Sequence, residues 1–147
     1  MRIAFGSDEQ TALTDAVAKR LAELGHQVVT FGALAPGQDD SWTSTARAVG
    51  EAVRDGGCDQ GVLCCWTGTG VSIAANKVRG VRAALCGDAP TASGARIWND
   101  ANVLCLSLRA TSPALGREIL DAWFAANPTT DPKYRAMIDE VKVHDRD

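Results

Sequence analysis

The sequence predicts an α/β fold, a single domain over residues 1–147 in which helices cover both faces of a five-stranded parallel sheet. Three observations lead to this prediction. Short apolar runs alternate with longer stretches of helical spacing, which is the pattern of repeated βαβ units. A length of 147 residues, 46% of them hydrophobic and 22% charged, suits one globular domain with a buried core. No change of composition, internal repeat or low-complexity segment marks a second domain.

Strands are expected where short apolar and β-branched runs end at glycine or at polar residues. Five such runs are present: Arg2–Gly6, Gln27–Phe31, Asp59–Cys65, Val81–Cys86 and Asn102–Leu106. The first run begins almost at the N-terminus, which lacks the features of a signal peptide.

Helices are expected where apolar residues recur every three or four positions. Leu13, Val17, Leu21 and Leu24, for example, share one face of a helix that Gly25 ends. In chain order, the predicted helices cover Thr11–Leu24, Trp42–Asp55, a segment that ends near Lys77, a segment from Gly87–Pro90 to about Ile97, Ser112–Ala126 and Pro132–His144.

Composition and charge argue against several classes of function. A net charge of −3 and a pI near 5.3 provide no basic surface for nucleic acid or for an anionic membrane. No apolar run approaches the roughly 20 residues of a membrane span. The five cysteines lie mostly in apolar runs without CxxC spacing, and the two histidines are far apart. These features predict buried, reduced thiols in a cytoplasmic protein, and no metal site.

The predicted topology brings several polar segments to one edge of the sheet, because ligands of open α/β sheets bind beyond the carboxyl ends of the strands. The segments are Ser7–Glu9, Cys65–Gly70, Gly87–Asp88 and Arg109. Trp98–Asp100 is instead predicted to be a loop that leads into a strand, and it therefore lies at the opposite edge. It can join the site only by folding over or by reaching a neighbouring subunit.

The segment after the third strand carries the strongest chemical signal. An apolar run ends at Cys64 and Cys65, passes a loop with Gly68 and Gly70, and enters an Ala-rich helix. Glycines let backbone N–H groups approach a ligand, and the helix N-terminus adds partial positive charge. Cys65, which faces away from Cys64 across the strand, is a candidate base that moves a proton while these amides hold an oxyanion. The alternative is that Cys65 is a small buried apolar residue.

The glycine loop also resembles part of a dinucleotide fingerprint. However, Ile73 replaces the third glycine, the loop follows the third strand and not the first, and the lysine of a P-loop is absent. We therefore expect a phosphate, carboxylate or enediolate ligand in preference to a nucleotide.

Acidic and aromatic residues beside the loop have two interpretations each. Asp8 and Glu9 either cap the first helix or accept hydrogen bonds from substrate hydroxyls. Trp66 is either an aromatic wall for a ligand or a plug that closes the pocket. Trp123, on the apolar face of a helix, is expected in the core.

Several blocks of the sequence resemble the family of ribose-5-phosphate isomerase B and galactose-6-phosphate isomerase. The most specific are Ser72–Lys77 and Gly80–Ala83, supported by Asn99–Leu104 and Asp121–Trp123. The resemblance implies a Rossmann-like three-layer sandwich with a five-stranded parallel sheet and a C-terminal helix. It also implies aldose–ketose isomerisation through a cis-enediol, without a metal ion or organic cofactor. The active site would lie between the subunits of a homodimer or homotetramer, with the helix over about 132–144 packed on a neighbouring subunit.

The resemblance also implies roles for individual residues. Cys65 matches the base of one branch of the family, whereas the glutamate that another branch uses is replaced here by Val71. Thr67 would assist proton transfer at the sugar oxygens. Asn99 would stabilise the enediolate together with three backbone amides, those of Gly68, Thr69 and Gly70.

Departures from the family pattern lie around the expected substrate. Asp8 matches the aspartate that holds substrate hydroxyls, but the histidine that normally follows it is Glu9. The glycine after the catalytic cysteine is Trp66. The histidine that helps to open the sugar ring is Trp98, so ring opening would lack its usual acid–base partner.

The phosphate-binding residues of the family are only partly present. Arg109 matches one arginine and Lys133 partly matches another, while Tyr134 and Met137 replace a histidine and a second arginine. Lysine binds a phosphate dianion less well than a bidentate arginine, and a nearby Glu9 carboxylate repels it. We therefore expect a substrate that is open-chain or lacks a phosphate: a short keto sugar, a sugar acid or an unphosphorylated polyol derivative. The alternative function is a non-catalytic sugar-binding, metabolite-binding or regulatory protein on the same fold.

Overall fold

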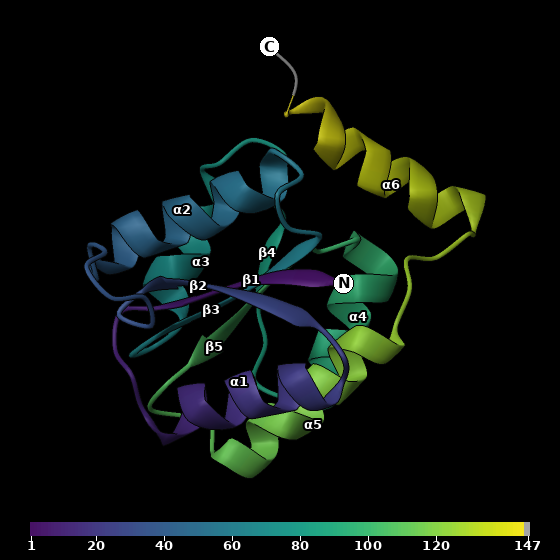
Figure 1. The fold of residues 1–147 in the computed structure, drawn as a ribbon. Helices are drawn as coiled ribbons and strands as arrows, with labels where there is room; N and C mark the ends of the chain where they lie inside the picture. Colours follow the sequence, from purple (N-terminus) through teal and green to yellow (C-terminus); the bar gives the residue numbers. More distant parts are fainter. Residues whose placement is uncertain (146–147) are drawn as a thin grey trace.

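Five parallel strands form the centre of the molecule in a computed structural model that describes residues 1–145 (Figure 1). Their order across the sheet is β2-β1-β3-β5-β4. The strands are β1 Arg2–Ser7, β2 Gln27–Gly32, β3 Gln60–Cys65, β4 Ala83–Leu85 and β5 Val103–Ser107. The predicted α/β fold is confirmed, and the last two residues of the predicted domain, 146 and 147, lie outside the described residues.

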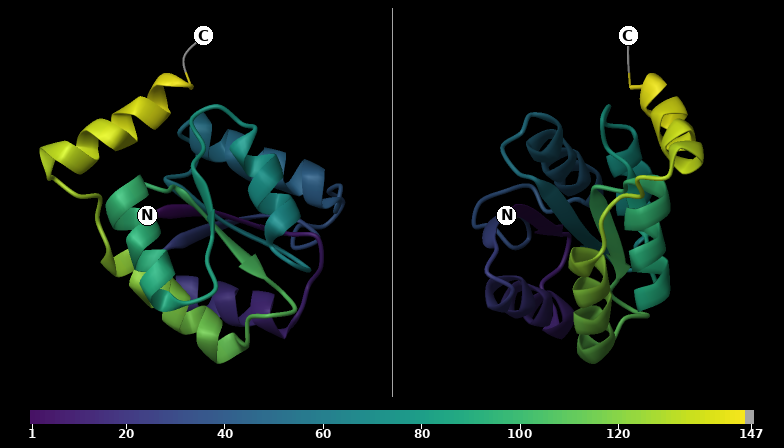
Figure 2. Two further views of the ribbon diagram at one scale, coloured as in Figure 1. Left: turned by 180° about the vertical axis from the view of Figure 1, so that it is seen from behind. Right: turned by 90° about the vertical axis from the view of Figure 1, so that its right-hand side faces the viewer.

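Helices cover both faces of this sheet. They are α1 Ala12–Glu23, α2 Trp42–Arg54, α3 Thr69–Asn76, α4 Ala89–Asn99, α5 Pro113–Ala125 and α6 Pro132–Val143. The apolar sides of α1, α4 and α5 pack on one face of the sheet, and those of α2 and α3 pack on the other. α6 stands away from the sheet and extends past the end of α4 (Figure 2).

The core consists of one apolar cluster on each face of the sheet. Phe5, Leu21 and Trp123 are fully buried on the side of α1 and α5, and Val49 is fully buried on the side of α2. The indole Nε1 of Trp123 donates a 2.7 Å hydrogen bond to Oε1 of Gln60, so this buried polar atom is satisfied. The predicted core position of Trp123 is therefore confirmed.

Most helices begin at a side chain that accepts a hydrogen bond from a free backbone N–H group of the first turn. The capping residues of α1, α2, α4, α5 and α6 are Thr11, Ser41, Asp88, Ser112 and Asp131. Because Thr11 caps α1, the interpretation of Asp8 as its cap is wrong. At α3 the N-cap position is occupied by Gly68 in the left-handed conformation, and no described side chain caps the helix.

Two predicted boundaries are wrong for reasons that lie in distant parts of the chain. The expected loop Trp98–Asp100 does not exist, because α4 continues through Asn99 and ends at Asp100 in the left-handed conformation. β4 starts later than predicted, because the backbone N–H of Arg82 donates to the side chain of Asn102 at 2.7 Å and does not join the sheet.

Within residues 1–145, no helix is long and apolar enough to cross a membrane. The same residues contain no group of three or more His, Cys, Asp and Glu side chains placed to hold a metal ion.

Candidate active site

The register of the sheet brings the predicted rim residues together. Cys65, the last residue of β3, lies opposite Ser107 of β5, and the residue before it lies opposite the end of β1. Asp8 and Glu9 directly follow β1, and Arg109 follows β5 by two residues. All of these residues therefore lie at the carboxyl ends of three adjacent strands, as predicted.

Adjacent cysteines at the end of β3 face opposite sides of the sheet. Cys64 belongs to the cluster under α1 and α5, where burial raises the pKa of its thiol, and Cys65 belongs to the cluster under α2 and α3. Cys65 is 5% exposed and packs among residues that include Val71 and Ala75 of α3. All five cysteines are free and buried, which confirms the predicted state of the thiols.

The turn after Cys65 strongly favours glycine at position 68. Gly68 has φ +74°, and its N–H donates to the carbonyl of Cys65 at 3.2 Å. A Cβ atom here would lie 2.5 Å from Cδ1 of Leu85 and 3.0 Å from the backbone of Leu106. The glycine therefore lets the chain pass close to β5 and enter α3 four residues after Cys65.

The start of α3 presents donors at the rim. The amides of Thr69, Gly70 and the following residue have no partner within the helix, and no side chain caps them. Gly70, predicted to be in the loop, lies in this first turn, and a Cβ atom on it would lie 3.0 Å from the ring of Trp42. The hydroxyls of Thr67 and Thr69 are 2.7 Å apart and both are exposed. This end of α3 therefore has the geometry of an oxyanion site.

Asp8 supplies an acceptor at the same rim. Its Oδ1 atom is buried and has no hydrogen-bond partner among the described residues. Burial raises the pKa of the Asp8 carboxyl, and the nearby carboxylates of Glu9 and Asp40 raise it further. Glu9 itself is exposed, and its carbonyl accepts a 2.6 Å hydrogen bond from the hydroxyl of Ser7. The Oδ1 atom of Asp8 is thus a buried acceptor at the rim that no described residue satisfies.

Trp66 lies at the rim, and its side chain is 60% exposed. A side chain this exposed does not plug a pocket. Its carbonyl accepts hydrogen bonds from the N–H of Arg109 and the hydroxyl of Ser107, both at 3.0 Å. A pocket of about 280 Å³ beside the loop is lined by residues that include Thr67 and Arg109. The two hydrogen bonds to the carbonyl of Trp66 hold the loop after β3 against the loop after β5.

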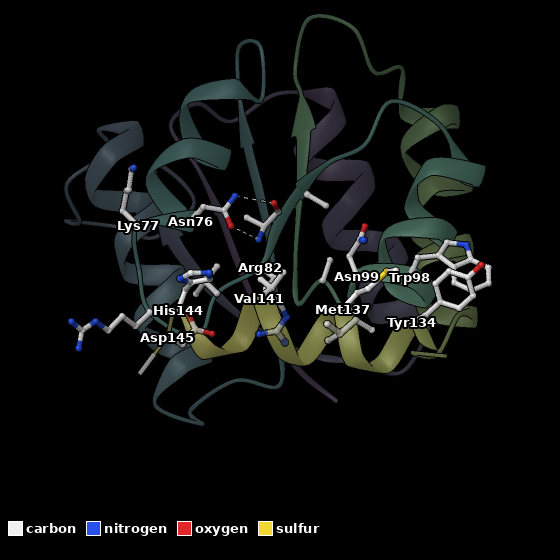
Figure 3. Close-up of a pocket in the computed structure, with 16 residues that line it drawn as sticks. Asn76, Lys77, Arg82, Trp98, Asn99, Tyr134, Met137, Val141, His144 and Asp145 are labelled. Atoms are coloured by element: carbon white, nitrogen blue, oxygen red, sulfur yellow. Dashed lines mark hydrogen bonds between the residues drawn. The ribbon is translucent and has the colours of Figure 1, made fainter. Parts of the chain in front are cut away.

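The remaining predicted site residues lie elsewhere: Trp98 and Asn99 line a second pocket of about 770 Å³ between α6 and the sheet edge (Figure 3), and Lys133 lies at the start of α6 outside its lining. Trp98 and Asn99 line it from the end of α4, and Tyr134 lines it from α6, with the rings of Trp98 and Tyr134 4.8 Å apart. The ammonium group of Lys133 lies 5.5 Å from the ring of Tyr134. α4 ends just before β5 begins, so this pocket lies toward the amino ends of the strands. Within one chain, Asn99 and Lys133 are therefore not brought to Cys65.

Trp42 is a rim residue that sequence reasoning did not include. It is the first residue of α2, and its partly exposed ring covers Gly70 in the first turn of α3. The available signal was a tryptophan at the start of a helix that follows a Gly- and Asp-rich loop, but only the packing of α2 on α3 reveals its neighbour.

Comparison with known proteins supports an enzymatic function. Residues 3–141 match the family model described as Ribose/Galactose Isomerase. The chain is 35% identical over 127 residues to D-erythrulose-4-phosphate isomerase of Pectobacterium atrosepticum, covering 86% of this chain and 84% of that one. It is 38% identical over 126 residues to ribose-5-phosphate isomerase B of Escherichia coli, covering 85% and 84%.

A solved structure leads to the same conclusion. Ribose-5-phosphate isomerase B of Clostridium thermocellum superposes with a TM-score of 0.89 at 33% identity, over 99% of this chain and 98% of that one. The non-catalytic alternative is not favoured by these similarities. The chain belongs to the Ribose/Galactose Isomerase family and is an aldose–ketose isomerase of the ribose-5-phosphate isomerase B type.

Proposed function

We propose that this enzyme interconverts the aldose and ketose forms of an open-chain, four-carbon sugar that carries a phosphate at C4. The similarity to D-erythrulose-4-phosphate isomerase supports the substrate class, and the pairing of free donors with an unpaired acceptor at one rim supports the reaction. The unpaired amides of α3 suit an enediolate oxygen, and the unpaired Oδ1 of Asp8 suits a sugar hydroxyl. Cys65 ends the strand that leads into α3 and packs in one apolar cluster with Val71 and Ala75 of that helix.

In the proposed reaction Cys65 is the base. Its thiolate removes the proton from C2 of the aldose, and the electrons move through the C1–C2 bond onto the carbonyl oxygen to form a cis-enediolate. The α3 amides of Thr69 and Gly70 stabilise this oxygen, while the Thr67 hydroxyl transfers a proton between O1 and O2. The Cys65 thiol then returns its proton to C1, which yields the ketose. The chain itself supplies every group, and the scheme requires no metal ion or organic cofactor.

The open-chain substrate follows from where the two histidines lie. The ring of His26 is 4.4 Å from that of Phe124, and its Nδ1 is 3.2 Å from the N-terminal amino group, at the amino end of β1. His144 lies at the end of α6, at the opposite end of the pocket from Asn99 in Figure 3. Within one subunit, neither imidazole lies at the rim, where it could open a sugar ring. A four-carbon sugar with its O4 atom phosphorylated cannot close a five-membered ring, so it needs no such group.

We also propose that a second copy of the chain completes the site. Asn99, Trp98 and Lys133 line or border the pocket at α6, away from Cys65 of the same chain. In a homodimer or homotetramer, the rim of one subunit would meet this pocket of its neighbour, and α6 would pack on the neighbouring subunit. The exposed apolar side chains at the two surfaces include Trp66, Ile73, Trp98, Met137 and Val141. Their burial is what such an interface would supply.

The reduced thiols support a cytoplasmic location within this proposal. Five free, buried cysteines without a disulfide are typical of a reducing compartment.

The test is proton exchange from solvent during turnover. D-Erythrose 4-phosphate and D-erythrulose 4-phosphate are incubated with the enzyme in D2O and followed by proton NMR, beside ribose 5-phosphate and unphosphorylated erythrose. We expect deuterium at the carbon next to the carbonyl, and a kcat/KM for the tetrose phosphates at least about tenfold above that for ribose 5-phosphate. A preference for ribose 5-phosphate would overturn the substrate class, and no exchange with any of the sugars would overturn the reaction.

A further inference from the structure

We propose that Trp42 is a specificity-determining residue: its indole forms one wall of the substrate site, beside the amides of α3, and limits the length of the sugar that fits. The inference rests on the proposed function, because that proposal places the reacting oxygens at these amides. It concerns the carbon chain of the sugar and not the transfer of protons.

The ring of Trp42 packs on the first turn of α3. Trp42 is the first residue of α2, and a Cβ atom on Gly70 would lie 3.0, 3.2 and 3.3 Å from Cε3, Cδ2 and Cζ3 of its indole. These three carbons form one edge of the six-membered ring. A side chain at position 70 would displace the ring, so glycine there lets the indole lie directly against the helix that supplies the proposed oxyanion donors.

The first turn of α2, which carries this ring, is held in place from both sides. Ser41 caps the helix, and the carboxylate of Asp39 accepts a 2.8 Å hydrogen bond from the N–H of Ser41. Thr45 is buried one turn along, and its Cγ2 atom would lie 2.7 Å from a Cβ atom on Gly6 and 2.8 Å from one on Gly32. The start of α2 is therefore seated on the ends of β1 and β2, and the indole has a rigid base.

Trp42 also lies close to the proposed acceptor. Burial raises the pKa of the Asp8 carboxyl, and the carboxylate of Asp40, two residues before Trp42, is near enough to add to this effect. The segment from Asp40 to Trp42 therefore leads from the neighbourhood of Asp8 to the first turn of α3. The indole thus borders the space between the acceptor and the donors of the proposed site.

Packing within the chain leaves part of this indole unused. Trp42 is 43% exposed, and its Nε1 atom has no hydrogen-bond partner among residues 1–145. The buried Trp123 differs on both counts, because it is 0% exposed and donates to Gln60. A sugar held by the α3 amides would cover the exposed face of the Trp42 ring and offer an oxygen to its N–H group.

The size of the indole explains a preference for a short sugar. A wall this large beside the amides leaves little length for carbons beyond the enediol. One carbon more or less against an apolar wall changes kcat/KM by about 10- to 200-fold. The structure therefore favours a four-carbon chain over a five-carbon chain at this site.

The variant Trp42→Ala tests the wall. We expect kcat/KM for D-erythrulose 4-phosphate to fall about tenfold and that for ribose 5-phosphate to change by less than about twofold, because the shortened side chain leaves the short sugar loose and admits the longer one. Thr45→Ala is the matched control, since it loosens the same turn of α2 and keeps the indole. It should lower both constants by the same factor. Urea unfolding of both variants checks that they fold.

A second measurement detects contact without turnover. The four tryptophan indole N–H groups are observed by ¹H–¹⁵N NMR, and Trp42→Phe identifies the signal of Trp42 by its loss. Titration of the wild-type protein with D-erythrulose 4-phosphate should shift this signal and leave that of the buried Trp123 in place.

Two results would overturn the inference: an equal loss for both sugars in Trp42→Ala, or a Trp42 signal that does not respond to the sugar phosphate. Turnover by the unaltered enzyme tests the proposed function separately. If neither sugar is converted, the proposed reaction is wrong, and the titration still decides whether the ring of Trp42 lies at the binding site.

Discussion

The rim at the carboxyl ends of the strands and the pocket at α6 are built in different ways. At the rim, sheet register and the start of α3 place Cys65, and the key groups are backbone amides. At the pocket, side chains on two helices are held together by ring contacts and ion pairs, such as Trp98 with Tyr134 and Lys142 with Asp100. The comparison teaches that, in the proposed reaction, the groups for proton transfer are placed by the rigid core, while the proposed phosphate would be met by side chains on the more exposed helix α6.

This contrast bears on how specificity changes in such a fold. A change at the rim must preserve a left-handed glycine and a strand register. A change on α6 alters exposed side chains, such as Lys133 and Met137, at little cost in stability. Substitutions on α6 and at the end of α4 can therefore adapt the enzyme to another sugar while the proton-transfer site remains.

Removal of the rim thiol should have the largest effect. Cys65→Ala is expected to lower kcat by about 10³-fold, because the base is lost while the binding groups stay in place. Deuterium incorporation from D2O measures the step directly. The matched control is Cys64→Ala, which shortens the neighbouring thiol on the other face of the sheet and should keep kcat within a few-fold. Equal losses in the two variants would contradict the assignment.

Substitution of the turn glycine should have the largest effect on stability. Gly68→Ala adds a methyl group against Leu85 and the backbone of Leu106 at a positive φ, and we expect a loss of about 2–3 kcal/mol in the free energy of unfolding in urea. Gly37 has a similar φ of +77° with nothing near its Cβ position, so Gly37→Ala should cost about 1 kcal/mol. A similar cost at both positions would show that the close approach at Gly68 is unimportant.

Mixing two inactive variants tests whether two subunits supply the two halves of one active site. Cys65→Ala removes the thiol at the rim, and Asn99→Ala removes the amide side chain at the pocket. A mixed dimer therefore contains one site with both residues intact. After unfolding and refolding together, random pairing should restore about a quarter of the wild-type activity. Refolding of each variant alone is the control. A mixed dimer that forms, as shown by differently tagged chains, but stays inactive would place both residues in one subunit's site.

The smallest expected effect is that of Asp8 on the free energy of unfolding. Because the pKa of this carboxyl is raised in the folded state, the free energy of unfolding of the wild-type protein should fall by a few tenths of a kcal/mol as the pH rises from the ordinary pKa of 3.8 through the raised pKa. Asp8→Asn removes this loss and should be slightly more stable at neutral pH. Its kcat/KM should nevertheless fall about tenfold, since a charged acceptor of the substrate hydroxyl is lost. Lower stability together with unchanged activity would assign Asp8 a purely structural role.

Much of the fold could be predicted from the sequence because strand and helix patterns are local. The strands at Arg2 and Gln27 begin as predicted, and Ser112 caps its helix with Pro113 in the first turn. The rim could be predicted too, because parallel topology requires residues after successive strands to meet at one edge. The prediction that Trp98–Asp100 is a loop failed because its polar residues resemble a turn, whereas ion pairs from Arg82 and Lys142 stabilise a helix end there.

The sequence by itself determined the α/β architecture, the buried thiols, the position of Cys65 before a glycine-led helix, and the family. These features depend on residue patterns within short segments and on one topological rule. Only the tertiary structure decided which helix remains uncapped and that a carboxylate oxygen of Asp8 lacks a partner, whereas the position of Asn99 away from Cys65 already followed from the predicted topology. The physical reason is that hydrogen-bond satisfaction and burial are properties of contacts between distant segments, which a local pattern does not contain.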